Sequence, residues 1–239
     1  MYMWQRRLRL CSFPSRSSTT FSKHYEPTTS PLAALQQKGV TEKTATTKAL
    51  TAATHFHTGG LPATIAVLNR LLLGSGKTRV LDVGCGLGGA AFSLLERHPD
   101  ASVIGIDGSS VYVSSAEEIA SWFPFGDRAT FKQVVIGAGD GAENRFAGIE
   151  GINGAYMMHL SQNLPLRALE EVRSNVARLS ADGGRFVFYE PFLAPNATPN
   201  DLNYPLPFAT DRPSSRKLLS GHGVPWKKAE LVDCIISGG

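Results

Sequence analysis

The residues best suited to binding a ligand are concentrated in one glycine-rich turn. The stretch Asp82-Val-Gly84-Cys-Gly86-Leu-Gly88-Gly89 follows a short apolar run and precedes a segment of helical character. Glycines in a strand-to-helix turn permit positive φ and let backbone N–H groups approach a ligand closely. Asp107 ends the next apolar run, 25 residues after Asp82, where a carboxylate can accept hydrogen bonds from both hydroxyls of a ribose. These residues predict a site for a ribose-bearing ligand.

The charge at the first position of this turn distinguishes between two ligands. Gly84-x-Gly86-x-x-Gly89 matches the dinucleotide fingerprint, with an acidic residue 18 positions beyond the last glycine. The Asp82 carboxylate, however, would repel a pyrophosphate at that helix terminus. S-adenosylmethionine (SAM) carries an ammonium and a sulfonium and no phosphate, so an acidic residue there is favourable. We therefore predict SAM as the cofactor, and not a nicotinamide dinucleotide.

Alternating strands and helices must hold this turn in place. The apolar patterns predict helices over 32–37, 61–73, 90–97, 111–122 and 166–179, and strands over Val80–Val83, Ser102–Ile106, Ala129–Ile136, Ile152–Met158, Arg185–Tyr189 and about Glu230–Ile236. This order predicts an α/β fold, a Rossmann-like, doubly wound, mostly parallel sheet with helices on both faces. Ligands bind such sheets at the carboxyl ends of the strands.

The first 25 residues differ in composition from the remainder. They hold five of the 24 basic side chains, many Ser and Thr, and no Asp or Glu. Two interpretations stay open. One is a transit peptide, for which a mitochondrion is favoured over a plastid, and the other is a disordered tail. Outside them 19 basic side chains face 20 acidic ones, so no basic footprint for a nucleic acid is predicted. No apolar run is long enough for a membrane span.

The remaining chain divides into a linker with a helical segment (26–54) and one folded domain (55–239). Three cysteines lie far apart without the spacing of metal ligands, so we predict no metal site.

The glycine-rich turn also resembles a known family. Val80–Ala90 resembles motif I of the class I SAM-dependent methyltransferases, and Ile104–Gly108 resembles the acidic end of their second strand. The segments 55–64, 155–159 and 203–208, together with Asn163 and the 167–189 region, resemble small-molecule members of the sarcosine and dimethylglycine type.

That resemblance implies roles for individual residues. Asp82, Gly84, Gly86 and Gly88 would line the methionine end of SAM, and Asp107 would hold the ribose. Asp140 either lies beside the adenine amino group or is a solvated loop residue. His57 and His159 are the catalytic candidates, since an imidazole can take a proton from an incoming nucleophile, and for both a pocket-wall role stays open. Tyr204 either contacts the substrate or packs in its loop.

We therefore predict methyl transfer from SAM to a small molecule, with an amine ahead of a quinone or phenol. The alternative is a non-catalytic scaffold or assembly factor in an organelle. The family has a further helix before its sixth strand and an antiparallel strand after it, whereas 214–228 is interrupted by Gly221, Gly223 and Pro225. A C-terminal truncation, a homodimer that covers the gap and a degenerate relative are the three explanations.

Overall fold

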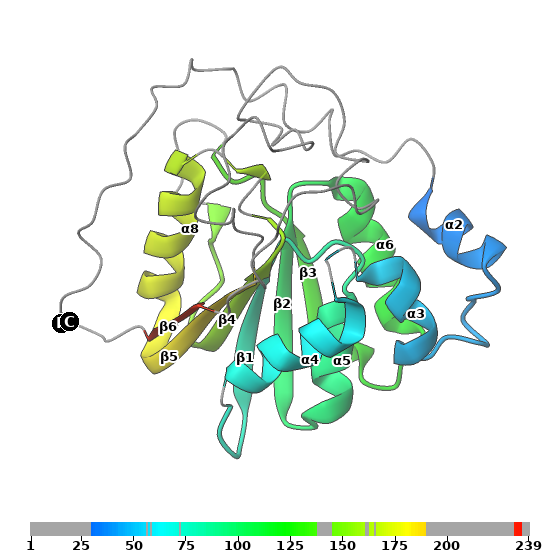
Figure 1. Ribbon diagram of the computed structural model, residues 1–239, viewed down its shortest axis with the longest axis horizontal. Coiled ribbons are helices and arrows are strands. Elements are labelled where there is room, and N and C mark those ends of the chain that lie inside the picture. Colours follow the sequence, from blue (N-terminus) through cyan, green and yellow to red (C-terminus); the bar gives the residue numbers. More distant parts are fainter. Residues whose placement is uncertain are drawn as a thin grey trace, which may run out of the picture.

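A six-stranded sheet in the order β3-β2-β1-β4-β5-β6 forms the centre of the protein (Figure 1). Its strands are β1 (Thr78–Val83), β2 (Ala101–Asp107), β3 (Ala129–Gln133), β4 (Ile152–Met158), β5 (Ser180–Tyr189) and β6 (Val232–Ile235). The first five are parallel to one another, and β6 runs antiparallel to β5. The predicted α/β fold with a mostly parallel sheet is confirmed.

The computed structural model describes residues 30–55, 57, 59–71, 73–137, 145–160, 163–164, 166–189 and 232–235. Residues 1–25, Asp140 and Tyr204 lie outside this set, so what we predicted for them stays a prediction, as does the division into domains.

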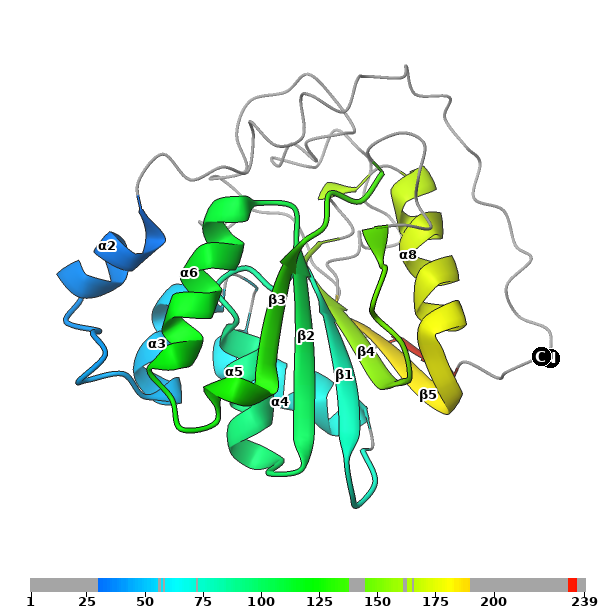
Figure 2. The same ribbon diagram turned by 180° about the vertical axis from the view of Figure 1, so that it is seen from behind.

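Helices cover both faces of the sheet. One face carries α2 (Pro31–Gln37), α3 (Thr47–Thr54), α4 (Gly60–Arg70), α5 (Gly89–Arg97) and α6 (Ser110–Ser121), and a 3-10 helix, η1, spans Gly126–Arg128. The other face carries α8 (Leu166–Leu179), which Figure 2 shows from behind. Alternating strand residues supply the two cores: Val80 and Val103 pack with the first group of helices, whereas Leu81 and Ile104 pack with α8. The apolar residues of the predicted strands therefore form two apolar layers, one on each face of the sheet.

Four elements differ from the predictions, each for a local reason. Helix α3 was not predicted, and it packs against α5. Strand β3 ends at Gln133 because its one neighbour, β2, ends at the paired residue Asp107. The predicted turn before Arg185 lies inside β5, where the register with β4 shifts. The last strand pairs antiparallel with β5, whereas the resemblance implied a sixth strand followed by a separate antiparallel one.

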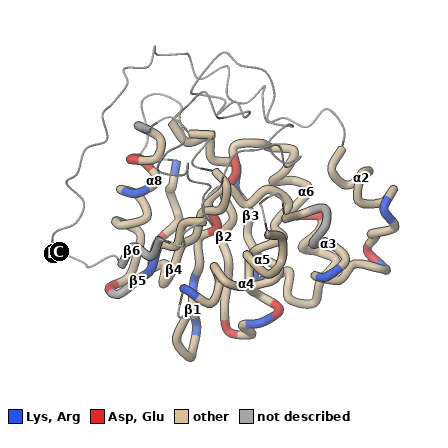
Figure 3. The backbone as a smooth tube through the Cα atoms, in the orientation of Figure 1, with Lys and Arg blue, Asp and Glu red and all other residues tan. Residues whose placement is uncertain are grey.

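Charged side chains of both signs are interspersed along the described elements (Figure 3). Within the described part of the chain, none of the helices combines the length and apolar character that a bilayer crossing requires.

Candidate active site

The glycine-rich loop, residues 84–89, closes tightly onto its surroundings. The N–H groups of Gly84 and Cys85 both donate to the Ile106 carbonyl, at 2.8 and 3.0 Å. Gly84 and Gly88 have φ of +81° and +79°, and a Cβ atom on either would approach a neighbouring side chain to 2.8 Å, Leu160 in the first case and Phe92 in the second. Both positions therefore require glycine, for conformation as well as for space.

Asp107, at the end of β2, braces this loop. Its Oδ2 accepts a hydrogen bond from the Gly86 N–H and its Oδ1 accepts one from the Ser109 N–H, both at 2.9 Å. Ser109 caps α6, so one carboxylate connects the loop to the start of that helix. A carboxylate offers about four acceptor positions, so these two hydrogen bonds alone do not saturate it. The bracing role had not been predicted from the sequence.

Asp82 is a buried carboxylate beneath the loop. Its side chain is 3% exposed, and Tyr156 lies opposite it in the β1–β4 register. Burial raises the pKa of Asp82 to about 7; the nearby Tyr156 hydroxyl lowers this pKa and the Asp107 charge raises it further. The Tyr156 hydroxyl is near enough to affect the pKa of Asp82, but the two side chains do not meet the geometric criteria of a hydrogen bond. Asp82 Oδ2 and the Tyr156 hydroxyl find no hydrogen-bond partner among the described residues. An unpaired buried carboxylate is costly, and a ligand cation would relieve that cost.

The two predicted catalytic histidines lie together on the other side of the site. The ring centroids of His57 and His159 are 6.1 Å apart, and each is 5.8 Å from that of Tyr189. The His159 and Tyr189 rings are stacked at 22°, and the His159 N–H donates to the Tyr189 carbonyl at 2.9 Å. The sequence analysis did not single out Tyr189, although it ends a predicted strand, as His159 nearly does.

His159 has an unusual backbone and a neutral ring. Its φ of +54° is uncommon for a residue other than glycine, and such conformations concentrate at functional sites. Burial, together with the neighbouring His57, lowers the pKa of His159 to about 4. The imidazole is therefore uncharged at neutral pH and can accept a hydrogen bond.

A second histidine pair meets at a threonine of α4. His55 Nδ1 lies 2.6 Å and His57 Nε2 lies 2.9 Å from the Thr64 hydroxyl oxygen, and Thr64 is fully buried. Burial, and secondarily His57, lowers the pKa of His55 to about 4. The sequence analysis gave neither His55 nor Thr64 a role; the His-x-His spacing was the available signal. Among the described residues no group of three His, Cys, Asp or Glu side chains is arranged to hold a metal.

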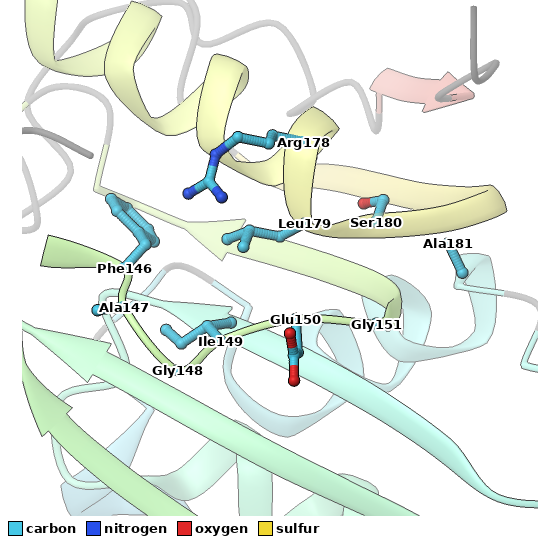
Figure 4. Close-up of a pocket in the computed structure, with 10 residues that line it drawn as sticks. All are labelled: Phe146, Ala147, Gly148, Ile149, Glu150, Gly151, Arg178, Leu179, Ser180 and Ala181. Carbon is cyan, nitrogen blue, oxygen red and sulfur yellow. The ribbon is translucent and has the colours of Figure 1, made fainter. Parts of the chain in front are cut away.

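A separate hollow of about 400 Å³ lies at the opposite ends of the strands, where β4 and β5 begin. It is formed by residues 146–151, which precede β4, and by residues 178–181 at the junction of α8 and β5 (Figure 4). None of the residues discussed above lines it. Because ligands of parallel sheets bind at the carboxyl ends of the strands, we assign the candidate site to the loop and histidines and not to this hollow.

Comparison with known proteins agrees with this assignment. A family model described as "Methyltransferase domain" matches residues 75–201, more than half of the chain. The chain belongs to the class I SAM-dependent methyltransferases. The matched part of the chain contains strands β1 to β5, the glycine-rich loop, Asp82, Asp107 and His159.

Curated relatives are similar to this chain over part of their length. A sterol 24-C-methyltransferase of Debaryomyces hansenii is 30% identical over 112 residues, which cover 47% of this chain and 27% of that protein. Methyltransferase ungE' of Aspergillus campestris is 41% identical over 56 residues, 23% of this chain and 16% of that protein. The matched region is thus about a quarter of the relatives' length or less.

Two solved structures share the fold. The [4+2]-cyclase SpnF superposes with a TM-score of 0.51 at 22% identity, over 76% of this chain and 62% of that chain. A phosphoethanolamine N-methyltransferase 2 of Haemonchus contortus, in complex with SAM, superposes with a TM-score of 0.50 at 19% identity. The superposition covers 71% of this chain and 37% of that chain. At these identities the similarity concerns the fold alone.

Proposed function

We propose that this chain binds SAM at the carboxyl ends of β1, β2 and β4 and transfers its methyl group to a small molecule. The observation that supports this most directly is the buried Asp82 carboxylate, whose Oδ2 atom has no hydrogen-bond partner among the described residues. SAM offers an ammonium and a sulfonium, and either charge would compensate a carboxylate at that depth. A pyrophosphate at the start of α5 would instead be repelled by Asp82.

The residues around the loop fit such a cofactor. The positive φ of Gly84 and Gly88 opens the loop backbone to close approach, and Asp82 supplies the negative charge beneath it. Asp107 ends β2 beside the loop, and a carboxylate there can accept hydrogen bonds from ribose hydroxyls. When bound, SAM supplies an electrophilic methyl group, and this chain has to hold an acceptor in line with it. Alignment in a dry pocket provides up to about 7–11 kcal/mol of rate enhancement.

His57 and His159 are proposed to contact the acceptor. Their rings lie together with Tyr189 next to the ends of β4 and β5, in the part of the site away from the Asp107 brace. The uncharged imidazole of His159 can accept a hydrogen bond from an N–H or O–H group of the acceptor and so orient the lone pair of that group. This suits an amine acceptor, which remains our first choice ahead of a phenol or quinone. A carbon acceptor belongs among the candidates because the name of the Debaryomyces relative specifies C-methylation.

Calorimetry tests the cofactor assignment. We expect SAM and S-adenosylhomocysteine to bind the full chain with micromolar affinity, and Asp82→Asn to weaken SAM binding at least tenfold. Ser115→Ala, which removes a buried hydroxyl on the outer helix α6, serves as the matched control and should bind as the parent does. Folded protein without SAM binding would instead favour the non-catalytic scaffold. The name of the cyclase SpnF indicates that this fold is not confined to methyl transfer.

A screen with methyl-labelled SAM tests the acceptor. Pools of small amines, phenols and quinones, and unsaturated lipids would be incubated with the chain and with His159→Asn, which tolerates positive φ. Label in an amine product, reduced at least tenfold by His159→Asn, supports the full proposal. Label only in a phenol or lipid pool would overturn the amine preference.

The localisation is also proposed. We propose that residues 1–25, which are rich in Arg and Ser and lack acidic residues, direct the chain to the mitochondrion. Fusion of these residues to a fluorescent reporter should place it in that organelle, and diffuse signal would contradict the proposal.

A further inference from the structure

Tyr156 is a fully buried tyrosine whose hydroxyl has no part in the methyl transfer proposed above. It lies within β4, and the register of the parallel strands β1 and β4 pairs it with Asp82. Paired residues of adjacent strands point to the same face of a sheet. Val80, two residues before Asp82, and Tyr156 both belong to the apolar layer on the side of α4 and α5. The strand register therefore brings a phenol and a carboxyl group together inside the protein.

The two polar groups of this pair are both buried and both unsatisfied. Asp82 Oδ2 and the Tyr156 hydroxyl have no hydrogen-bond partner among the described residues. Buried polar groups are nearly always hydrogen-bonded, because leaving one unpaired is costly. The hydroxyl already lies near enough to lower the pKa of Asp82, so a change in side-chain torsion, without movement of the strands, would join the two groups.

Ionisation of Asp82 fixes the direction of such a hydrogen bond. An ionised carboxylate can only accept, whereas a protonated phenol can donate. Tyr156 keeps its proton, because burial, followed by the Asp82 charge, raises the pKa of its hydroxyl well above the ordinary value. The phenol is therefore the donor whenever Asp82 is ionised.

The other titratable groups around Asp82 do not supply this donor. Asp107 faces it from β2 and has a charge of the same sign. Cys85 faces it from the glycine-rich loop; its thiol donates to the Gly86 carbonyl oxygen at 3.8 Å, and burial with the two carboxylates raises its pKa, so that it stays neutral. The charged side chains of the covering helices α4 and α5 are exposed in the last turns of those helices: Arg70, Glu96 and Arg97. Tyr156 is thus the group placed to stabilise an Asp82 charge.

We propose that Tyr156 is a positioning residue for the cofactor, whose hydroxyl donates to Asp82 Oδ2, stabilises the ionised carboxylate and leaves Oδ1 for the ammonium group of SAM. Asp82 then binds this cation at a lower pH than its burial alone would permit. The role toward the cofactor rests on the proposed SAM binding, whereas the effect of Tyr156 on Asp82 does not depend on it.

Nuclear magnetic resonance of the ligand-free chain, with aspartate labelled with ¹³C at the side-chain carboxyl, tests the effect on Asp82 directly. The Asp82 signal is the one that disappears in Asp82→Asn. We expect it to titrate with a midpoint near pH 7 in the parent. In Tyr156→Phe the midpoint should lie about one to two pH units higher, the size expected for the loss of a hydrogen bond to a charged group. Equal midpoints in the two proteins would overturn the proposal.

The asparagine variant of Asp82 supplies the matched background for stability. Tyr156→Phe removes a buried hydroxyl and so changes Tm at every pH, whatever its role. If it also raises the pKa of Asp82, the folded variant keeps the Asp82 proton to a higher pH, and its Tm relative to the parent should fall between pH 7 and pH 8.5. In the Asp82→Asn background the same substitution should shift Tm equally at both pH values. A pH-dependent shift in that background would assign the effect to a group other than Asp82 and refute the proposal.

Binding of S-adenosylhomocysteine tests the consequence for the cofactor, because this compound has the ammonium group of SAM without the sulfonium charge. At pH 6 calorimetry should show roughly ten- to a hundredfold weaker affinity for Tyr156→Phe than for the parent, and at pH 9 a difference within about twofold, as a midpoint raised by one to two units requires. An equal loss of affinity at both pH values would make Tyr156 a packing residue and reject its positioning role. If the parent binds no S-adenosylhomocysteine at either pH, the proposed function fails, whereas the Asp82 titration still decides whether Tyr156 acts on that carboxylate.

Discussion

Replacing Asp82 by asparagine should make the protein more stable and at the same time impair cofactor binding. In the folded protein burial holds the pKa of Asp82 at about 7, against 3.8 for a free side chain. Between pH 4 and pH 7 the folded state thus keeps a proton that the unfolded state has lost. Stability must fall as the pH rises through this window, because the folded state binds more protons than the unfolded state.

The size of the effect follows from the shift in pKa. Each unit corresponds to 1.36 kcal/mol, so an Asp82 shift of this size destabilises the ligand-free protein by about 4 kcal/mol at most once the pH exceeds 7. The amide of the asparagine variant would not titrate and would avoid this cost. We therefore expect Asp82→Asn to exceed the parent in stability by about 1.6 kcal/mol already at pH 5, which lies above the ordinary pKa of 3.8, and by about 4 kcal/mol at pH 8.5.

Thermal denaturation at pH 5, 7 and 8.5, with and without SAM, measures this difference. For a chain of this length 1 kcal/mol shifts Tm by about 2–4 °C. SAM should raise the Tm of the parent and have little effect on the variant. Equal Tm values for the two proteins at all three pH values would refute the assignment of a raised pKa to Asp82. A variant that is more stable but binds SAM normally would refute its role in the cofactor site.

Three further predictions follow from the loop and its surroundings. Asp107→Ala removes two charge-assisted hydrogen bonds that the carboxylate accepts from the backbone. Calorimetry should therefore show SAM affinity reduced ten- to a hundredfold, and a melting scan should show a stability loss of roughly 1–3 kcal/mol. Asp107→Asn should lose less affinity and less stability. Gly105→Ala would place a Cβ 2.5 Å from the buried ring of Phe131 and should cost about 1–3 kcal/mol in urea unfolding. Gly74→Ala, which meets no atom within 4 Å, should be neutral in the same experiment, and an equal cost for both would contradict the packing argument.

Much of the fold could be predicted from the sequence because the strands and long helices carry strong periodic patterns. The bounds predicted for β4 and α8 equal those in the structure. Helix α3 was missed because its Thr and Ala residues make a weak apolar pattern, and it is stabilised by packing on α5. The end of β3 depends on where its neighbour β2 ends, which lies outside any local window.

The site divides in the same way between local and long-range information. The glycine-rich loop and Asp82 form a contiguous motif, so their predicted position could be read along the chain. The placement of Tyr156 opposite Asp82 depends on the β1–β4 register, which no local pattern encodes. The meeting of His57, His159 and Tyr189 joins three distant segments, and the bracing of the loop by Asp107 needs the geometry of two hydrogen bonds.

The position of β1 between β2 and β4 also bears on how the protein folds. β1 joins β2 through the single helix α5, whereas it meets β4 only after two more strands have been traversed. Closing the longer loop costs more chain entropy, so the half formed by β1, β2 and β3 is favoured to assemble before β4 docks on it. Leu160, which packs against Gly84, arrives with the second half. A ligand that contacts both halves would bind only after they have docked. At a ligand concentration of a hundred times its Kd, it would stabilise the docked state by about 2.7 kcal/mol.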